Sequence, residues 1–362
     1  MKGYYGLNKE NVALDNTKCI VVTKNGDSVG TIALKTLRGK YLGKKLYSFG
    51  CISDAHTFVN SSYTDDTTAN DDYIKAIQFF RDNNCNFTCI CGDLTCRGTW
   101  FNQGTYGNEL EHFQILTNAN RGNMPVYTIA GNHEHWWRCD SSTTSLEEFE
   151  DYLQNYTGHP LCYTFTKGND VFIMCGCVTN NEVFNQSTIQ WLYEQLEENR
   201  NKRCFLFIHS FIKGSQYCGD CMELYPFNMI SGNYNTAFIN LLSHYRNVIY
   251  FHGHSHELFE MQEYTEGLYS SPPCNYDYTL GSHSVHIPSL AIPIDSTTGE
   301  RIRINEGSQG YMIDVFENGI VLKGRDFKKD SWVPIGTYQI NTTLVNVPEK
   351  TFTDTTGLIT TS

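Results

Sequence analysis

Five apolar runs in the sequence each lead into side chains that could bind a metal ion. These side chains comprise two carboxylates, one amide and several imidazoles. They are Asp54 and His56, Asp93, Asn132 and His133, His209, and His254 and His256. Sites in open α/β sheets form at the carboxyl ends of strands. If the apolar runs are strands, these residues should therefore meet in one place.

The mixture of nitrogen and oxygen donors indicates which ions would bind. Imidazole and carboxylate ligands together suit Mn²⁺, Fe, Zn²⁺ or Ni²⁺, whereas sets of oxygen ligands alone suit Mg²⁺ or Ca²⁺. There are more ligands than one ion can use, so two ions about 3.5–4 Å apart with one bridging carboxylate are predicted. A purely structural role is disfavoured, because burying so many unpaired polar groups would cost considerable free energy.

The segments that would position these residues alternate between strand and helix. Short apolar runs predict strands, and apolar residues with helical spacing between them predict helices. The predicted strands cover residues 46–53, 87–91, 126–129, 204–208 and 247–251. The predicted helices cover residues 70–83, 110–116, 146–155, 186–199 and 234–245, with Ser187 as an N-cap. This alternation is typical of an α/β fold in which helices cover sheet layers.

Further strands are expected outside this alternation. A hairpin over residues 19–34 surrounds Asn25-Gly26, and paired strands are expected at 163–166 with 171–177 and at 310–316 with 319–327. Residues 262–283 have no periodicity and predict a long ordered loop, while 337–362 fit either a tail or an edge strand. We expect an accessory segment at 1–45, a main domain at 46–330 and a Thr-rich extension at 331–362.

Composition and charge narrow the function classes. The chain has 362 residues, of which 40% are hydrophobic, and a formal net charge of −12 without a Lys/Arg block. This argues against binding to nucleic acid through phosphate contacts. A phosphate substrate is still compatible, because bound ions reverse the local field. With no apolar leader and no run of roughly 20 apolar residues, a cytoplasmic protein that does not bind membranes is expected.

The cysteines predict neither disulfides nor a zinc site. There are 14 in the chain, and several lie inside apolar strands, where reduced cysteine behaves as a small hydrophobe. Cys218 and Cys221 form a CxxC pair, but a structural zinc site needs a second pair and none is evident.

The order of the polar motifs carries a family resemblance between Leu46 and Glu257. The motifs are Asp-x-His at 54–56, Gly-Asp at 92–93, Gly-Asn-His-Glu at 131–134, an isolated His209, and Gly-His-Ser-His at 253–256. This order resembles the calcineurin-like metallophosphoesterases, and the motif style is most similar to their cyclic-nucleotide phosphodiesterase and purple-acid-phosphatase-like branch. The resemblance implies a four-layer α+β fold, a β-sandwich of mixed sheets flanked by helices, with additional terminal β elements.

The resemblance also implies a role for each motif residue. Asp54, His56 and His256 would bind the first metal ion. Asn132, His209 and His254 would bind the second, and Asp93 would bridge the two. His133 would contact the phosphate together with Asn132 and act as the general acid. Glu134, which stands where the family usually has Asp, would orient the His133 imidazole.

Four residues near these motifs have two interpretations each. Arg97 has the spacing of the phosphate-gripping arginine in the Ser/Thr phosphatase branch, although Cys96 replaces the Asp of that motif, and a solvated loop cation is the alternative. Trp136 and Trp137 fit either the core or an aromatic wall beside the site. His135 could contact the substrate or cap the loop.

The leading hypothesis is a phosphoesterase with two divalent or transition-metal ions. A hydroxide bridging the ions would attack phosphorus in line, and His133 would protonate the leaving alkoxide. The substrate would be a small-molecule phosphomonoester or phosphodiester. One alternative is an assembly protein of a larger particle that retains this scaffold and binds a protein partner, or a second copy, through its terminal β elements. The other is a nuclease of the same superfamily, which the missing basic stripe disfavours.

Overall fold

The computed structural model describes residues 18–22, 28–33, 42–59, 68–96, 108–135, 146–179, 182–212, 232–259, 282–293, 307–342 and 351–361. Within these ranges, β1 (Lys18–Val22) and β2 (Ser28–Ala33) pair in an antiparallel sheet of their own. The two predicted N-terminal strands are therefore confirmed. The Asn25-Gly26 turn, the Cys218–Cys221 pair and most of the predicted 262–283 loop lie outside the described residues.

One main sheet has six strands and carries three of the predicted polar strand ends. Its order is β13 (Ser331–Asn341), β12 (Gly319–Asp326), β11 (Gln309–Phe316), β3 (Lys45–Ile52), β4 (Thr88–Cys91) and β5 (Val126–Ile129). The strands β3, β4 and β5 are parallel, whereas β11, β12 and β13 run antiparallel to their neighbours. The predicted hairpin near 310–327 is confirmed, and β13 makes the start of the Thr-rich segment an edge strand.

The second main sheet has five strands and carries the remaining polar ends. Its order is β10 (His283–His286), β9 (Val248–His252), β8 (Cys204–Ile208), β7 (Asp170–Cys175) and β6 (Cys162–Lys167). All are parallel except β6, which pairs antiparallel with β7. The sequence did not predict β10, because a four-residue strand with two histidines lacks the apolar signal of a buried strand.

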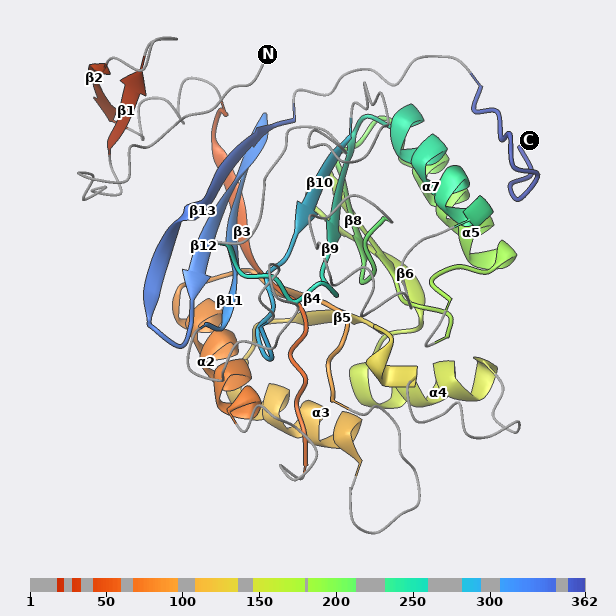
Figure 1. Ribbon diagram of the computed structural model, residues 1–362, viewed down its shortest axis with the longest axis horizontal. Coiled ribbons are helices and arrows are strands. Elements are labelled where there is room, and N and C mark those ends of the chain that lie inside the picture. Colours follow the sequence, from red (N-terminus) through yellow and green to blue (C-terminus); the bar gives the residue numbers. More distant parts are fainter. Residues whose placement is uncertain are drawn as a thin grey trace.

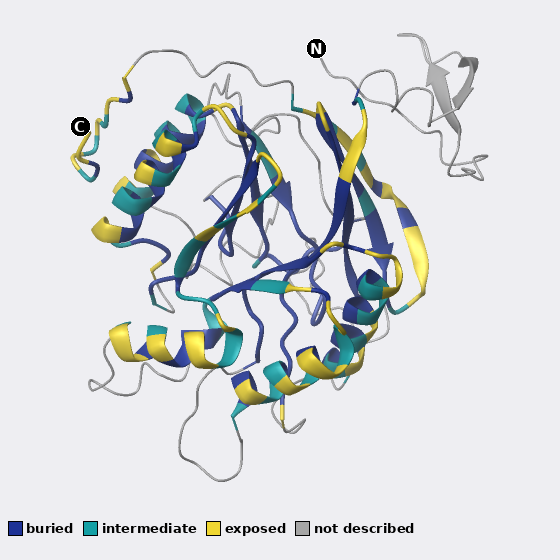
Figure 2. Cartoon of the chain, turned by 180° about the vertical axis from the view of Figure 1, so that it is seen from behind, coloured by how far each residue is buried: buried dark blue, intermediate teal, exposed yellow. Residues whose placement is uncertain are grey.

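An aromatic layer fills the space between the two sheets. Phe49 on β3 contacts Phe172 on β7 and Phe205 on β8, with ring centroids 5.4 and 5.6 Å apart in edge-on geometry. Figure 2 shows that the strands of both sheets are mostly buried, whereas the helices expose their outer faces. Burial of this layer holds the two sheets face to face and so fixes where their strand ends meet.

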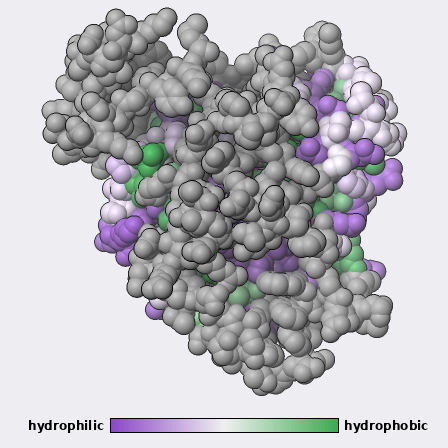
Figure 3. All heavy atoms as spheres, viewed as in Figure 1, coloured by the Kyte–Doolittle hydropathy of each residue, from purple (hydrophilic) through white to green (hydrophobic). Residues whose placement is uncertain are grey.

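Helices cover the outer face of each sheet (Figure 1). The helices α2 (Ala69–Asp82), α3 (Glu109–Asn120) and α4 (Leu146–Thr157) contribute to one core beside the six-stranded sheet, and α5 (Gln186–Glu198) and α7 (Gly232–His244) contribute to another beside the five-stranded sheet. Hydrophilic and intermediate residues dominate the visible surface on the side of α5 and α7 in Figure 3. Mixed sheets flanked by helices confirm the predicted fold class.

The start of α5 differs from the prediction by two residues. Asn185, not Ser187, is the N-cap, because its side chain accepts a hydrogen bond from the Thr188 backbone N–H at 2.9 Å. The Thr188 hydroxyl in turn lies 2.9 Å from the Asn185 backbone N–H, which donates to it. This reciprocal pair is a capping box and sets the helix start.

The described part of the C-terminal segment packs against the second helix layer. Phe352 and Ile359 are buried in the core that α5 and α7 share. The backbone N–H of Thr360 also donates to the Gln190 side chain at 2.7 Å. Among the described residues, no helix combines the length and apolar character needed to cross a bilayer.

Candidate metal centre

The carboxyl ends of five parallel strands from both sheets bring the predicted ligands together. Each ligand lies within four residues of the end of β3, β4, β5, β8 or β9. Among the described residues, two groups have side-chain atoms close enough to share an ion. They are Asp54, His56, Asp93 and His256, and Asp93, His209 and His254. Asp93 belongs to both groups, so the two candidate positions are adjacent.

Distances within the cluster are short. His256 Nε2 lies 3.2 Å from Asp54 Oδ1, and His209 Nε2 lies 3.1 Å from Asp93 Oδ2. His56 Nε2 lies 3.1 Å from His256 Nε2 and 3.8 Å from Asp93 Oδ2. Ligand atoms therefore converge on a small volume between the sheets.

Several of these atoms are buried without a hydrogen bond of normal geometry to any described residue. They are Asp54 Oδ1, Asp93 Oδ2, Asn132 Oδ1, His209 Nε2 and His56 Nδ1. Leaving a buried polar atom unsatisfied costs about 1–3 kcal/mol, and more for a charged group. The atoms are carboxylate, amide and imidazole donors, which are the chemical types that bind Mn²⁺, Fe, Zn²⁺ or Ni²⁺. The residues present therefore fit a pair of such ions.

Backbone carbonyls set the orientation of two imidazoles. His209 Nδ1 lies 2.7 Å from the Cys91 carbonyl, and His256 Nδ1 lies 2.7 Å from the Ile292 carbonyl. A carbonyl can only accept, so each Nδ1 carries the proton and donates it. In the neutral ring the Nε2 lone pair then faces the cluster, as a metal ligand requires. Side-chain types could not reveal these partners, because every residue has a carbonyl.

The backbone at the ligands is strained. Of the non-glycine residues that the structure describes, eight have a positive φ. Five of them are predicted ligands, namely Asp54, His56, Asp93, His254 and His256, with φ between 44° and 71°. Such conformations cost of order 1–3 kcal/mol each and concentrate at functional sites. The strand ends are therefore held in conformations that local preference would not choose.

Two glycines permit the close approach of the strand ends. A Cβ at Gly131 would collide with Asp93 Oδ1, and one at Gly253 would collide with Ser53 Oγ. Both glycines directly precede a predicted ligand, Asn132 and His254. Their presence in the motifs thus follows from packing, because any side chain would separate adjacent ligand loops.

His133 and Glu134 both lie beside the cluster and are tied to it by hydrogen bonds. The His133 backbone N–H donates to Asp93 Oδ1 at 2.9 Å, and its Nδ1 donates to the Cys96 carbonyl at 2.6 Å. The Glu134 carboxylate accepts instead from the backbone N–H groups of Thr95 at 3.0 Å and Gly131 at 2.7 Å. The Cys96 carbonyl therefore orients the His133 ring, and Glu134 ties two ligand loops together; an orienting role of Glu134 stays a prediction.

Charges within the cluster reinforce one another. Burial opposes charge on Asp93, but the neighbouring imidazoles of His209 and His133 outweigh it and hold the pKa of Asp93 well below its usual range. Burial likewise opposes charge on His209, but Asp93 and Asp54 raise the pKa of His209 to about 10. Burial, followed by repulsion from His209, lowers the pKa of His254 to about 4. Binding of metal at His209 would therefore release a proton.

Three of the predicted residues around the site are not placed. Arg97, Trp136 and Trp137 lie outside the described residues. His135 is buried, its Nε2 lies 2.7 Å from the Cys177 carbonyl, and its ring lies 3.8 Å from the Phe149 ring. Of its two interpretations, the structure gives His135 the contacts of a residue that fixes the loop.

Comparison with known proteins places the fold. Three examples from the solved structures that are similar to the chain follow. A dimetal phosphatase from Danio rerio is 14% identical, with 83% of this chain and 100% of that chain covered and a TM-score of 0.57. GAP50, described as the anchor in the inner membrane complex of Plasmodium, is 14% identical, with 82% and 89% covered and a TM-score of 0.46. Yfce, a phosphoesterase from E. coli, is 13% identical, with 82% and 99% covered and a TM-score of 0.35.

The first of these likenesses indicates a common fold at an identity too low to transfer a substrate. A comparison with curated protein sequences gives no match. The profile of the calcineurin-like phosphoesterases matches residues 47–258, more than half of the chain, from within β3 to just beyond the Gly-His-Ser-His motif. The chain therefore belongs to the calcineurin-like phosphoesterase family.

Proposed function

We propose that this protein hydrolyses small-molecule phosphate esters with the help of two divalent or transition-metal ions. The observation that carries the proposal is the pair of ligand groups that share Asp93. Both groups contain buried ligand atoms without a hydrogen bond of normal geometry, and bound cations would satisfy these atoms. The family supports a phosphoesterase, while the choice between monoester and diester substrates is part of the proposal.

Each ligand has an assigned place in this proposal. Asp54, His56 and His256 would hold one ion, and Asn132, His209 and His254 the other, with Asp93 shared between them. Two such ions, when bound, lower the pKa of water and neutralise phosphate oxygens. The carbonyls that hold His209 and His256 keep these ligands oriented before any ion binds.

His133 would supply the proton for the leaving group. Its Nδ1 is committed to the Cys96 carbonyl, so Nε2 is the atom that can hold and deliver a proton. The Nε2 atom lies 4.0 Å from Asp93 Oδ2 and its side chain is 18% exposed, so it borders the cluster and still reaches solvent. A general acid has to lie in this position, beside the reacting phosphate and outside the ligand set.

Metal analysis and two model substrates test the proposal on the full chain. After loading with Mn²⁺ or Ni²⁺, we expect two ions per chain and turnover of p-nitrophenyl phosphate, bis-p-nitrophenyl phosphate or both. The ratio of the two rates assigns monoesterase or diesterase activity. A chain that binds no ion and turns over neither substrate would overturn the proposal and favour the scaffold alternative. Cleavage of short DNA with no turnover of either small substrate would favour the nuclease.

A further inference from the structure

A short segment that follows β10, residues 289–292, lies beside the loop of the first predicted ligand. Ser289 pairs with Ser53 in a parallel bridge, and the Ala291 N–H donates to the Asp54 carbonyl at 3.0 Å. The segment therefore continues the hydrogen bonding of β3 past the end of that strand, along the backbone of Asp54. The family profile ends at residue 258, so the segment lies outside the part of the chain that the profile matches.

The same segment holds the ring of a second ligand. His256 Nδ1 donates to the Ile292 carbonyl at 2.7 Å and lies 3.4 Å from Ser289 Oγ. Ser289 is fully buried, and its hydroxyl donates to the Ala291 carbonyl. The Ser289 hydroxyl therefore lies between the backbone of the segment and the His256 ring, where it can hold one against the other.

The carbonyl that orients His256 belongs to a residue with an unusual backbone conformation. Ile292 has a φ of 54°, in the left-handed region, which a β-branched residue rarely adopts. Pro293 follows it, and a residue before proline is restricted further. Such conformations persist only where the surrounding structure imposes them, and they cluster at functional sites. Packing therefore holds Ile292 in a conformation that turns its carbonyl toward His256.

Apolar packing connects the segment to the loop of a third ligand. Ala291 and Ile292 are buried in one small cluster with Phe58, which lies two residues after His56. The Asn70 side chain fixes the Phe58 backbone, because it accepts from the Phe58 N–H at 3.0 Å and donates to the Phe58 carbonyl at 2.8 Å. The segment thus packs on a rigid stretch that continues from His56.

We propose that residues 289–292 position the ligands of the first ion and thereby set its affinity, with Ser289 as a positioning residue. The inference rests on the proposed function, which assigns Asp54, His56 and His256 to that ion. Partners that orient a metal ligand without touching the metal contribute roughly 10- to 100-fold to its affinity. The segment contains no predicted ligand, so its influence acts through the three ligands that it supports.

The second ion has separate support. His209 Nδ1 donates to the Cys91 carbonyl at 2.7 Å, and Cys91 is the last residue of β4 in the six-stranded sheet. This carbonyl is placed by the pairing of β4 with its neighbours and does not depend on the 289–292 segment. A change in the segment should therefore weaken the first ion much more than the second.

Calorimetric titration of the metal-stripped full chain with Mn²⁺ tests the proposal. We expect two binding events in the wild type, and Ser289→Ala should weaken one of them about 10-fold while the Ile292 carbonyl remains. Ile292→Pro should weaken the same event about 100-fold, because the proline ring fixes φ near −65° and turns the carbonyl away. Ile292→Gly, which adopts the left-handed region freely, should weaken it less than Ile292→Pro does.

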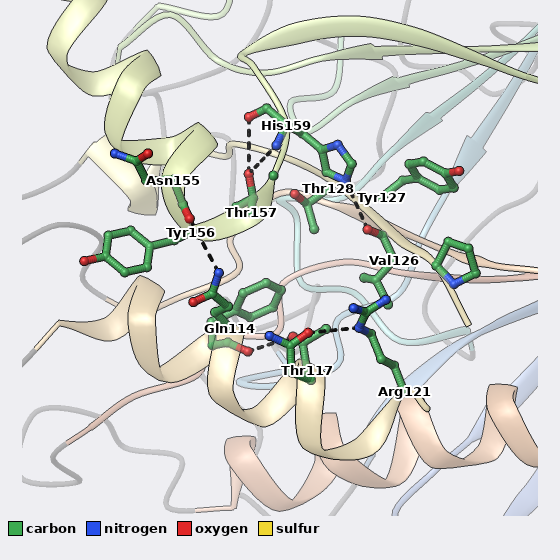
Figure 4. Close-up of a pocket in the computed structure, with 14 residues that line it drawn as sticks. Gln114, Thr117, Arg121, Val126, Tyr127, Thr128, Asn155, Tyr156, Thr157 and His159 are labelled. Carbon is green, nitrogen blue, oxygen red and sulfur yellow. Dashed lines mark hydrogen bonds between the residues drawn. The ribbon is translucent and has the colours of Figure 1, made fainter. Parts of the chain in front are cut away.

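Two control variants remove buried hydroxyls elsewhere. Ser282→Ala is the matched control, because Ser282 directly precedes β10, is also fully buried and donates to the Tyr245 carbonyl at 3.0 Å. Thr117→Val changes the wall of a pocket of about 480 Å³ between α3, the end of α4 and β5 (Figure 4), where the Thr117 hydroxyl donates to the Phe113 carbonyl at 2.7 Å. Both variants should bind two ions with wild-type affinity.

A double-variant cycle identifies which ion is weakened. His56→Ala should remove the first binding event, and adding Ser289→Ala to it should leave the remaining event unchanged. Weakening of that remaining event by Ser289→Ala would overturn the proposal. Wild-type affinities in both Ser289→Ala and Ile292→Pro, beside two ions in the wild type, would overturn it as well and leave the proposed function standing. A wild-type chain that binds no ion would overturn both.

Discussion

Strand β8 has a buried polar cluster at each end, and the two clusters are built in opposite ways. Arg203 directly precedes the strand and His209 directly follows it. Arg203 donates to both oxygens of Asp170, at 2.9 and 2.6 Å, and to the Phe316 carbonyl at 2.8 Å. The Tyr47 hydroxyl also donates to Asp170, at 2.6 Å. Here both carboxylate oxygens are satisfied within the protein.

In the cluster after β8, the carboxylate oxygens are not all hydrogen-bonded within the protein. Asp54 and Asp93 each keep one buried oxygen that makes no hydrogen bond of normal geometry to the described residues, although an imidazole Nε2 lies 3.1–3.2 Å from it. Both also lie in the left-handed region, at φ 55° and 49°, whereas neither Asp170 nor Arg203 has a positive φ. Burial of charge is therefore common to both ends and does not by itself identify a functional site. The cluster after β8 has unsatisfied acceptors on a strained backbone, which indicates a ligand site. The cluster before β8 has neither feature and joins the two sheets.

The largest effect is expected at the shared carboxylate. Asp93→Asn should reduce turnover by about 10³-fold or more and reduce metal content below one ion per chain, because both positions lose their common anion. Metal analysis and p-nitrophenyl phosphate assays measure the two effects. Full metal content in the variant would contradict the bridging role of Asp93. The contrast between Asp93 as a metal ligand and Asp170 as a structural carboxylate would then fail.

The next effect separates proton delivery from metal binding within the same cluster. His133→Ala should lower turnover by about 10²–10⁴-fold at unchanged metal content, because His133 lies outside the two ligand groups. Metal analysis beside the kinetic assay provides the control. If the variant loses metal, the assignment of His133 as the proton donor is wrong.

Stability should respond most strongly at the satisfied end. Arg203→Met leaves the Asp170 carboxylate buried without its cation and should lower the free energy of unfolding by about 3–5 kcal/mol. The matched control is Lys45→Met, which removes an ion pair to Asp314 from a lysine that is 45% exposed and should cost at most about 1 kcal/mol. Urea unfolding of the metal-free proteins measures both. Equal losses in the two variants would remove the distinction between the buried and the surface pair.

The smallest effect is the response of stability to metal. Added Mn²⁺ at 10 times its Kd should stabilise the chain by about 1.4 kcal/mol per site, because the ion binds only the folded protein. Thermal unfolding should show this shift in wild type and in Arg203→Met, and a much smaller one in Asp93→Asn. A shift of equal size in all three proteins would mean that the ions bind outside the Asp/His cluster.

Periodicity predicted most helices and strands correctly, since apolar spacing reflects which face is buried. Sequence patterns were misleading at the start of α5, where two nearby residues have side chains suited to an N-cap. Ser187 and Asn185 are both good N-caps, and only the backbone geometry at Asn185 selects between them. Periodicity gave no signal for β10. Val285 and His286 are buried because β10 pairs with β9, and the strand has no apolar pattern of its own.

The sequence by itself determined which side chains are available as ligands and that each follows a strand. It also determined the family, because five ordered motifs depend only on residue types and their order. The tertiary structure alone decided which ligand atoms converge, which carbonyls orient His209 and His256, and that the Cys96 carbonyl contacts the His133 ring. These choices depend on backbone groups that every residue has, so their position in space is fixed only when the two sheets pack together.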